Sequence, residues 1–487
     1  MMFLKKLLDQ ITMYRLMLYF LLVLITVNII FSFLKIFPFN YIDIFLAAVY
    51  FALICNVSNY IFAKLVGART NLESASITAL ILTLIIGPLP FLSNILTLTI
   101  FGSVAMLSKY ILAIRKKHIF NPVAIAIVIT GVILKTEATW WIGGILLISI
   151  IIIGGLLILM KIKKFELVTS FLLVYLSLIL LNQMSIPIAF INPWIWFFIL
   201  VMLVEPLTSP LTTKFQVLFG GFVALVYFAI FKIMPGYVYS LETALLAGNL
   251  FTLFFSPSSN IVLEFIKKIK VADNTWSFYF QPLSKVNFIP GQYMEWTYPH
   301  KNPDSRGVRR YFSLSSTPDK KYITVTMRVN EKGSSFKKAL LKMVSGAQIM
   351  ASSPYGEFIL PNDKNVPLCF IAAGIGITPF CSMIESLLET GEKRDIIMLY
   401  SNSTPQDIAF EQLLQKANRT GIKTYFIITK KDGHIDDKMI KEKVVDYKQR
   451  IFYLSGPEPA VVAFKKMLVK MKVKAIKTDY FPGYVNS

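Results

Sequence analysis

Cysteine and histidine are scarce in this sequence, with three of each among 487 residues. The cysteines are too few for a disulfide framework and lack the spacing of metal ligands, and a chain without disulfides is typical of a reducing compartment. The three histidines are His118, His300 and His434. Only His118 lies near the apolar part of the chain, in a basic loop. A membrane protein that holds haems between paired histidines is therefore excluded.

Acidic residues are also few: 28 Asp and Glu face 50 Lys and Arg, a net charge of +22. Many of the basic residues lie in short loops between apolar segments rather than in one basic region. Basic loops of this kind meet anionic lipid and set the orientation of membrane proteins. The charge therefore indicates membrane lipid as a partner and argues against nucleic acid.

Hydrophobic residues make up 55% of the chain, more than an ordinary soluble protein of this length contains. They are concentrated in residues 13–256, which predicts a polytopic all-α membrane domain over residues 1–260. About ten segments are long enough, or nearly so, to cross a bilayer. They lie near 13–34, 42–63, 75–91, 94–113, 120–134, 140–160, 165–182, 188–204, 215–232 and 241–256. The third, fifth and tenth are short enough to be re-entrant or broken helices.

The basic residues also predict the orientation of these segments. With the N-terminus inside, the outer loops carry only Lys35, Lys135 and Lys232. The inner loops carry fifteen Lys and Arg, and the last three of these are Lys267, Lys268 and Lys270. The positive-inside rule then places both termini in the cytoplasm. No short apolar region with a cleavage site follows Met1–Lys6, so the first segment is expected to remain as a span. We expect a multi-pass protein of a bacterial inner membrane.

A weak internal repeat runs through the apolar half. Residues 101–110 resemble 218–225, polar stretches at 71–76 and 205–210 precede them, and Asn121 and Asn249 follow them. Membrane proteins built from two related halves bind ligands where the halves meet.

The remainder of the chain has the pattern of two soluble domains. Short alternating strands near 276–282, 292–297, 310–315, 322–328 and 347–352 predict an antiparallel β-barrel over residues 261–360. Strands that alternate with helices after Pro361, among them helices predicted at 407–417 and 437–443, predict an α/β domain with a parallel sheet over residues 361–487.

The clearest local pattern is an apolar run, Leu368–Ala373, that ends in a glycine turn. Gly374, Gly376 and Thr378 lie in this turn, and Pro379 suits the first turn of the helix that follows. A strand, a glycine turn and a helix start place a pyrophosphate on free backbone N–H groups.

Further motifs lie on both sides of this turn. Arg310, Phe312 and Ser313 combine a phosphate-binding guanidinium, a ring that can stack on a flavin and a hydroxyl that can bond to it. Ser334 and Ser335 open a short helix, where they offer N–H groups to a phosphate or serve as a plain N-cap. Ser455, Gly456 and Pro457 follow a strand at the ligand-binding edge of the sheet. Phe481, after the last strand, is a ring that can cover a flavin or fill the core.

In this order and spacing the motifs of residues 270–487 resemble the ferredoxin–NADP reductase family. The resemblance implies that Arg310, Phe312 and Ser313 contact FAD, with Ser334 and Ser335 at its phosphates. It also implies that Gly374, Gly376 and Pro379 cradle the nicotinamide cofactor, with Ser455, Gly456 and Pro457 beside its reactive ring. Ser313 and Ser455 would then be the catalytic residues. Phe312 replaces a more usual Tyr, and Ser455 a frequent Cys.

The choice of nicotinamide cofactor depends on the end of the second strand. Residues 401–404, Ser-Asn-Ser-Thr, contain no Arg for a 2′-phosphate, which favours NADH over NADPH. FAD, rather than FMN, follows only from the family resemblance.

The membrane half resembles the D component of the Rnf electron-transport complex and, more distantly, the B component of the sodium-pumping NADH:quinone reductase. The segments that carry this resemblance are 71–83, 121–124, 138–143 and 205–210. Those relatives carry FMN esterified to a Thr, and here Thr139 is the nearest counterpart. The resemblance implies a second flavin, FMN or another, in this domain. A polar outer loop at Thr139 and a non-covalent flavin near Glu73, Ser74, Ser76 and Thr78 are the alternatives.

Together these features predict a membrane-bound flavoprotein oxidoreductase that passes electrons from NADH through FAD to an acceptor in or across the membrane. The acceptor would be a quinone, a flavin of the membrane domain or a redox partner protein. The alternative is a redox-driven Na⁺- or H⁺-translocating component of an Rnf-like complex. No metal site is expected.

Overall fold

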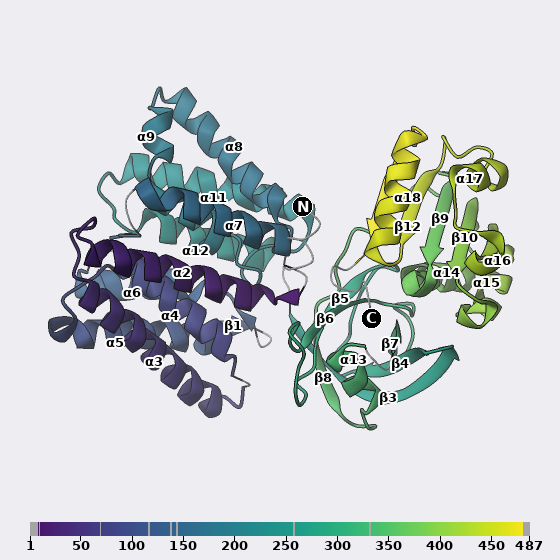
Figure 1. The fold of residues 1–487 in the computed structure, drawn as a ribbon, viewed down its shortest axis with the longest axis horizontal. Helices are drawn as coiled ribbons and strands as arrows, with labels where there is room; N and C mark the ends of the chain where they lie inside the picture. Colours follow the sequence, from purple (N-terminus) through teal and green to yellow (C-terminus); the bar gives the residue numbers. More distant parts are fainter. Residues whose placement is uncertain are drawn as a thin grey trace. The chain divides into compact units, whose positions relative to one another are not determined.

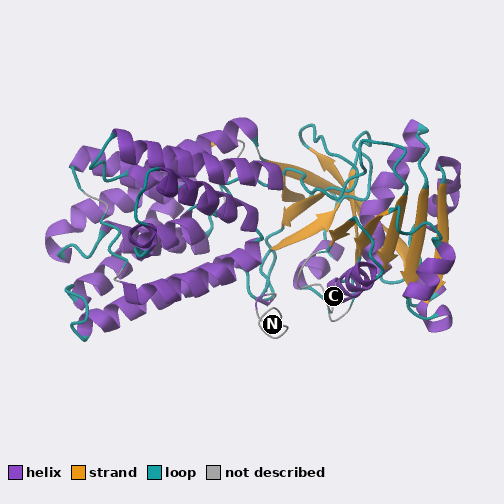
Figure 2. Ribbon diagram, turned by 90° about the horizontal axis from the view of Figure 1, so that it is seen from above, coloured by secondary structure: helices purple, strands orange, loops and turns teal. Residues whose placement is uncertain are grey.

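The computed structural model describes residues 8–480 except residues 9, 69, 115–116, 137–138, 143–144, 257–258 and 331–332. The chain divides into two compact units, Met1–Ser259 and Asn260–Ser487. Helices build the first unit, and strands with flanking helices build the second (Figure 2).

The first unit contains the apolar helices that the sequence predicts (Figure 1). They are α2 (Met13–Phe33), α3 (Tyr41–Leu65), α4 (Leu72–Ile86), α5 (Phe91–Ile111), α6 (Pro122–Leu134), α7 (Ile148–Ile162), α8 (Phe165–Leu181), α9 (Ile186–Phe190), α10 (Pro193–Phe197) with the π-helical η2 (Phe198–Met202), α11 (Thr213–Ile233) and α12 (Ser240–Phe255). Among the described residues, five helical segments are long and apolar enough to cross a membrane. The segments predicted to be short are short: α4, α6 and α12 have 15, 13 and 16 residues. The number of spans and their orientation stay predictions.

The two halves of the predicted repeat meet through their asparagines. Asn121, the N-cap of α6, holds the N–H groups of Val123 and Ala124 with its side-chain oxygen. Its own backbone N–H donates to Asn249 Oδ1 on α12 at 2.8 Å. The two repeated segments lie on α5 and α11, and these helices pack on α3 and α8, respectively. The equivalent positions of the repeat are thus side by side in the folded unit.

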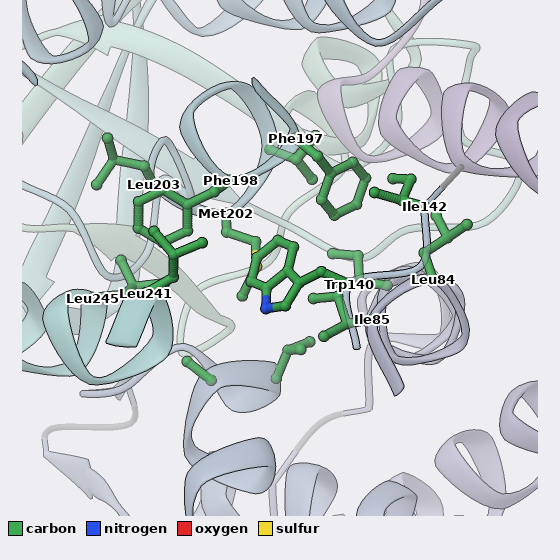
Figure 3. Packing of buried hydrophobic residues seen from close by; sticks show 14 of the residues in the cluster. Leu84, Ile85, Trp140, Ile142, Phe197, Phe198, Met202, Leu203, Leu241 and Leu245 are labelled. Atoms are coloured by element: carbon green, nitrogen blue, oxygen red, sulfur yellow. The ribbon is translucent and has the colours of Figure 1, made fainter. Parts of the chain in front are cut away.

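Trp140 is buried in the hydrophobic core of this unit (Figure 3). Its ring packs edge-on against Phe197 and Phe198, and its indole N–H donates to Glu242 Oε1 at 2.8 Å. Glu242 is fully buried. The bond gives a buried carboxylate one of the partners that it needs in an apolar environment.

The second unit begins with a six-stranded antiparallel sheet of order β6-β5-β8-β3-β4-β7. Its strands are β3 (Asn260–Ala272), β4 (Thr275–Pro282), β5 (Tyr293–Thr297), β6 (Arg309–Ser313), β7 (Ile323–Arg328) and β8 (Gln348–Ser352), and the helix α13 (Ser335–Leu341) precedes β8. An antiparallel bridge between Leu314 and Val325 brings the two edges of the sheet together. Complete closure into a barrel stays a prediction.

Strand β3 is the main difference from the sequence analysis. The sequence predicts regular structure only from Trp276 onward, but β3 begins at Asn260, shortly after the last apolar helix ends at Phe255. Lys267, Lys268 and Lys270, which count there as inner-loop charges, lie on this strand. The strand alternates buried and more exposed positions over its first half, the pattern of a sheet with one face on the core.

A parallel sheet of order β11-β10-β9-β12-β13 completes the unit. Its elements are β9 (Leu368–Ala373), η3 (Gly374–Ile377), α14 (Thr378–Thr390), β10 (Ile396–Asn402), η4 (Pro405–Asp407), α15 (Glu411–Lys416), η5 (Ala417–Thr420), β11 (Ile422–Ile428), α16 (Thr429–Asp432), α17 (Asp437–Lys443), β12 (Ile451–Ser455), α18 (Glu458–Lys470) and β13 (Ile476–Asp479). The strand order reverses between β9 and β12. Ligands of open α/β sheets bind beyond the carboxyl ends of the strands at such a point.

Candidate active site

The glycine turn lies at the point where the strand order reverses. Gly374 has φ +53°, a conformation that favours glycine. A Cβ added at Gly376 would lie 2.3 Å from the backbone oxygen of Ser455 and 2.5 Å from Gly456 Cα. The turn therefore touches the end of β12 directly. Thr378 and Pro379 are buried in the first turn of α14, and the Thr378 hydroxyl donates to the Ile375 oxygen at 3.2 Å.

Ser455 connects this turn to the last strand. It pairs with Ala372 of β9 on one side and with Asp479 of β13 on the other. Ser455 is buried, and Pro457 beyond it is exposed. Three strand ends, those of β9, β12 and β13, thus meet at one edge of the sheet.

Asp479 joins this edge to the antiparallel sheet. The Ser313 hydroxyl at the end of β6 donates to Asp479 Oδ2 at 3.0 Å, and both residues are buried. Ser313 and Ser455, predicted separately as catalytic residues, are therefore linked through one residue. The sequence motifs predict no role for Asp479. Its position at the end of the last strand, at the ligand-binding edge of the sheet, is the signal that could have identified it.

Arg310 lies in a dense network at the start of the same strand. Its guanidinium donates to Asp304 Oδ1 at 2.7 Å and to Ser334 Oγ at 3.0 Å. The Ser335 N–H donates to Asp304 Oδ2 at 3.0 Å. The predicted phosphate-binding residues Arg310, Ser334 and Ser335 are thus gathered in one place.

Two further cations lie beside this network. Arg306 Nη2 lies 3.5 Å from Asp304 Oδ2. Lys337, on α13, is only 3% exposed, and burial together with the nearby Arg306 and Arg310 lowers its pKa to about 7. Partial burial raises the pKa of Asp304, but Arg310, the Ser335 N–H and Arg306 outweigh this effect and hold it at about 2. Arg306 and Arg310 thus contact one carboxylate, and Lys337 lies near both arginines. A cluster of three basic side chains suits a diphosphate.

Phe312 and Phe481 are the two aromatic residues predicted to lie against a flavin. Phe312 is buried in the core of the antiparallel sheet, with its ring 5.9 Å from that of Phe336. Tyr311 points to the other face of the strand and packs edge-on against Tyr293. Phe481 lies outside the described residues. A flavin-stacking role for Phe312 or Phe481 stays a prediction.

In the helical unit, Thr139 is exposed, and a Cβ added at Gly87 would lie 2.6 Å from its hydroxyl oxygen. Glu137 and Ala138 of the predicted attachment motif lie outside the described residues. Attachment of a flavin at Thr139 stays a prediction.

The alternative flavin position at residues 73–78 is occupied by protein contacts. Glu73 pairs with Arg15 at 3.0 Å, Ser76 accepts from Asn56 Nδ2 at 3.1 Å, and Thr78 accepts from Lys109 Nζ at 3.0 Å. The cavity lined by Ser74 and Thr78 has a volume of about 60 Å³. Typical ligand pockets measure roughly 300–1,000 Å³, so this cavity weighs against a flavin there.

Comparison with known proteins bears on the second unit. Residues 370–466 match the family model described as the oxidoreductase NAD-binding domain. A flavohemoprotein of Oceanobacillus iheyensis is 29% identical over 225 residues, which cover 43% of this chain and 55% of that protein. An NADPH oxidoreductase of Mycobacterium tuberculosis is 28% identical over 189 residues, which cover 38% of this chain and 47% of that protein. The chain spans about half the length of these curated relatives.

A solved ferredoxin–NADP⁺ reductase of Plasmodium falciparum has 18% sequence identity and a TM-score of 0.40, and the match covers 46% of this chain and 96% of that one. The C-terminal half of this chain is thus similar in sequence to an oxidoreductase NAD-binding domain and to flavohemoproteins, which agrees with the nicotinamide-binding domain predicted there. The resemblance of the helical unit to the Rnf component and to its sodium-pumping relative stays a prediction.

Proposed function

We propose that this chain is a membrane-bound flavoprotein oxidoreductase that transfers electrons from cytoplasmic NADH through FAD to an acceptor in or across the membrane. The bond between Ser313 and Asp479, together with the pairing of Asp479 and Ser455, carries the proposal. It brings the serine of the predicted flavin motif and the serine of the predicted nicotinamide motif to one residue. Two cofactors that exchange a hydride need such a common point, because reacting atoms must lie within about 3.5 Å.

The residues of the second unit support this assignment. Arg306, Arg310 and Lys337 would hold the FAD diphosphate, and the Gly374–Gly376 turn would admit the NADH pyrophosphate without steric conflict from a side chain. Ser313 and Asp479 would orient the reacting rings and hold a proton beside them. FAD, when bound, supplies the chemistry that converts a two-electron donor into single-electron or paired transfers.

The acceptor is proposed from the helical unit. Its apolar helices would place it in a membrane, where a quinone at the inner interface could receive electrons directly. The hydrocarbon core is roughly 30 Å thick, so transfer across it would require a carrier such as a second flavin at Thr139. A redox partner protein is the third acceptor that we consider.

A second candidate function is redox-driven translocation of Na⁺ or H⁺. Glu205 supports it, because Asn121 at 2.8 Å, Thr208 at 2.9 Å and His118 at 3.5 Å hold its carboxylate where the two halves of the repeat meet. Acidic residues within membrane-spanning segments mark ion and proton routes. An ion-translocating protein would generate a membrane potential during NADH oxidation.

The first experiment is a flavin count on the purified full chain, before and after acid precipitation. One releasable FAD per chain is expected, together with NADH-dependent reduction of ferricyanide. A second flavin retained on the denatured protein, and lost in Thr139→Val, would support a relay through the membrane. A colourless protein that reduces no dye after incubation with FAD would refute the proposed function.

Identification of the electron acceptor requires the chain to be reconstituted in a membrane. The chain in liposomes with ubiquinone or menaquinone, NADH and a potential-sensitive dye separates a reductase from a pump. Quinone reduction without a potential supports the first candidate, and a potential that is lost in Glu205→Gln but not in Glu73→Gln supports the second.

A further inference from the structure

The carboxylate of Asp304 fills the position that the proposed function gives to a phosphate. It accepts from Arg310 Nη2 at 2.7 Å, from the Ser335 N–H at 3.0 Å and from the Arg306 N–H at 3.0 Å. The same guanidinium and N–H groups are those that a flavin diphosphate would use. Asp304 is thus placed as an internal anion within the cation cluster.

Arg310 has little capacity for an additional ligand in this arrangement. Its Nη1 donates to the backbone oxygens of Arg306 at 2.8 Å and Gly307 at 3.0 Å, and its Nη2 donates to Asp304 and Ser334. The side chain is only 4% exposed. A diphosphate oxygen that takes the place of one of these acceptors on Nη1 or Nη2 would replace Asp304, because it is the charged one and is partly exposed.

The segment that carries Asp304 is a hairpin loop that polar contacts hold at Arg310 and Ser335. Residues 298–308, here named the Asp304 loop, connect β5 to β6, and the Tyr298 N–H bonds to the Val308 oxygen at its base. Asp304 is also tied to α13 by its own N–H, which donates to Ser335 Oγ at 2.9 Å. Asn302 and Gly307 within the loop have positive φ angles. The contacts of Asp304 with Arg310 and Ser335, together with the bonds from Arg310 to the Arg306 and Gly307 oxygens, therefore hold this hairpin loop in place.

The charge balance supports an exchange of anions. Arg306 and Arg310 bring two positive charges to the Asp304 carboxylate, and Lys337 near both arginines can add a third to the cluster. A diphosphate brings two negative charges and more acceptor oxygens than Asp304 has. It can therefore take over the contacts of the carboxylate, which on release enters water at a partly exposed position.

We propose that Asp304 is the resting occupant of the flavin phosphate site, and that FAD binds by displacing its carboxylate and releasing the Asp304 loop. This inference rests on the proposed function, because it takes Arg310 and Ser335 as phosphate-binding residues. Asp304 competes with the cofactor, so it lowers the apparent affinity for FAD and keeps the empty site from binding other anions.

The test compares the flavin-depleted full chain in detergent with its Asp304→Asn variant. FAD binding is measured by quenching of flavin fluorescence, and pyrophosphate binding by thermal shift. Since apparent affinity scales with the fraction of open sites, we expect Asp304→Asn to bind FAD about tenfold more tightly and to gain more stability from pyrophosphate. Asp273→Asn, which removes an exposed carboxylate 3.4 Å from Lys270, is the matched control and should leave both readouts unchanged.

Hydrogen exchange of the wild-type chain gives a second readout that needs no variant. The N–H groups of Asp304 and Arg306 lose their partners when the loop is released, so FAD should accelerate exchange in residues 298–308 while it slows exchange in residues 333–338. Equal or weaker FAD binding by Asp304→Asn, or slower exchange of the loop with FAD, would overturn the proposal. Neither protein binding FAD, with pyrophosphate stabilising Asp304→Asn more than the wild type, would refute the proposed function. It would still support the inference that Asp304 competes with a diphosphate for this site.

Discussion

Replacement of Gly376 by Ala tests the contact on which the proposed hydride transfer depends. The added Cβ would lie 2.3 Å from the Ser455 oxygen and 2.5 Å from Gly456 Cα, against about 3.5 Å for an ordinary contact. Both neighbours are backbone atoms, so the turn and the end of β12 must separate by roughly 1 Å. A displacement of this size at a reacting centre costs about 10²-fold in rate, and overpacking costs about 1–3 kcal/mol of stability.

We therefore expect kcat/KM for NADH in ferricyanide reduction to fall about 10²-fold, with the FAD content unchanged. Gly391→Ala is the matched control, because Gly391 ends α14, the helix that follows the glycine turn, with φ +68° and open space around an added Cβ. It should lose about 1 kcal/mol of stability through backbone strain and keep its kinetics. Wild-type kinetics in Gly376→Ala, or a loss of FAD instead of NADH turnover, would refute the reasoning.

Three further predictions concern the same unit. Ser313→Ala removes the donor to Asp479, so stopped-flow reduction of bound flavin by NADH should slow by about 10- to 10²-fold at an unchanged KM for NADH; an unchanged rate would remove Ser313 from the site. In flavin-depleted protein the unfolded chain binds more protons than the folded one between the lowered pKa of Lys337, about 7, and its ordinary 10.5. The thermal midpoint should therefore rise with pH from 7 to 9, and Lys337→Met should flatten this slope; an equal slope in both proteins would contradict the assignment. NADH should be preferred to NADPH by roughly 10²-fold in kcat/KM, since no charge-assisted bond to a 2′-phosphate is formed. Ser403→Arg should narrow this ratio, and a wild type that prefers NADPH would contradict the interpretation of residues 401–404.

Local signals predict most of the second unit well. The helix α17 begins and ends where the sequence places it, and β9 has the predicted bounds, because an apolar strand bounded by Pro and Gly has few alternatives. The helix predicted at 407–417 is shorter, Glu411–Lys416, since Phe410 adopts φ +61° and breaks the helical path. The sequence does not predict strand β3, because this lysine-rich segment follows an apolar helix directly and has the composition of a loop that flanks a membrane span.

The candidate site shows where prediction from sequence ends. Gly376, which would bind a ligand through the backbone, and Arg310, which belongs to a compact motif, can both be identified from the residues next to them in the sequence. Asp479 reaches Ser313 across 166 residues only because β13 pairs with β12 in one register, and a one-residue slip would turn its side chain to the other face. Asp304 meets Arg310 within a loop of ordinary composition. The ligand-facing groups are thus predicted from motifs. Asp479 depends instead on strand register and Asp304 on the closure of its loop, and neither carboxylate belongs to a motif that the sequence shows.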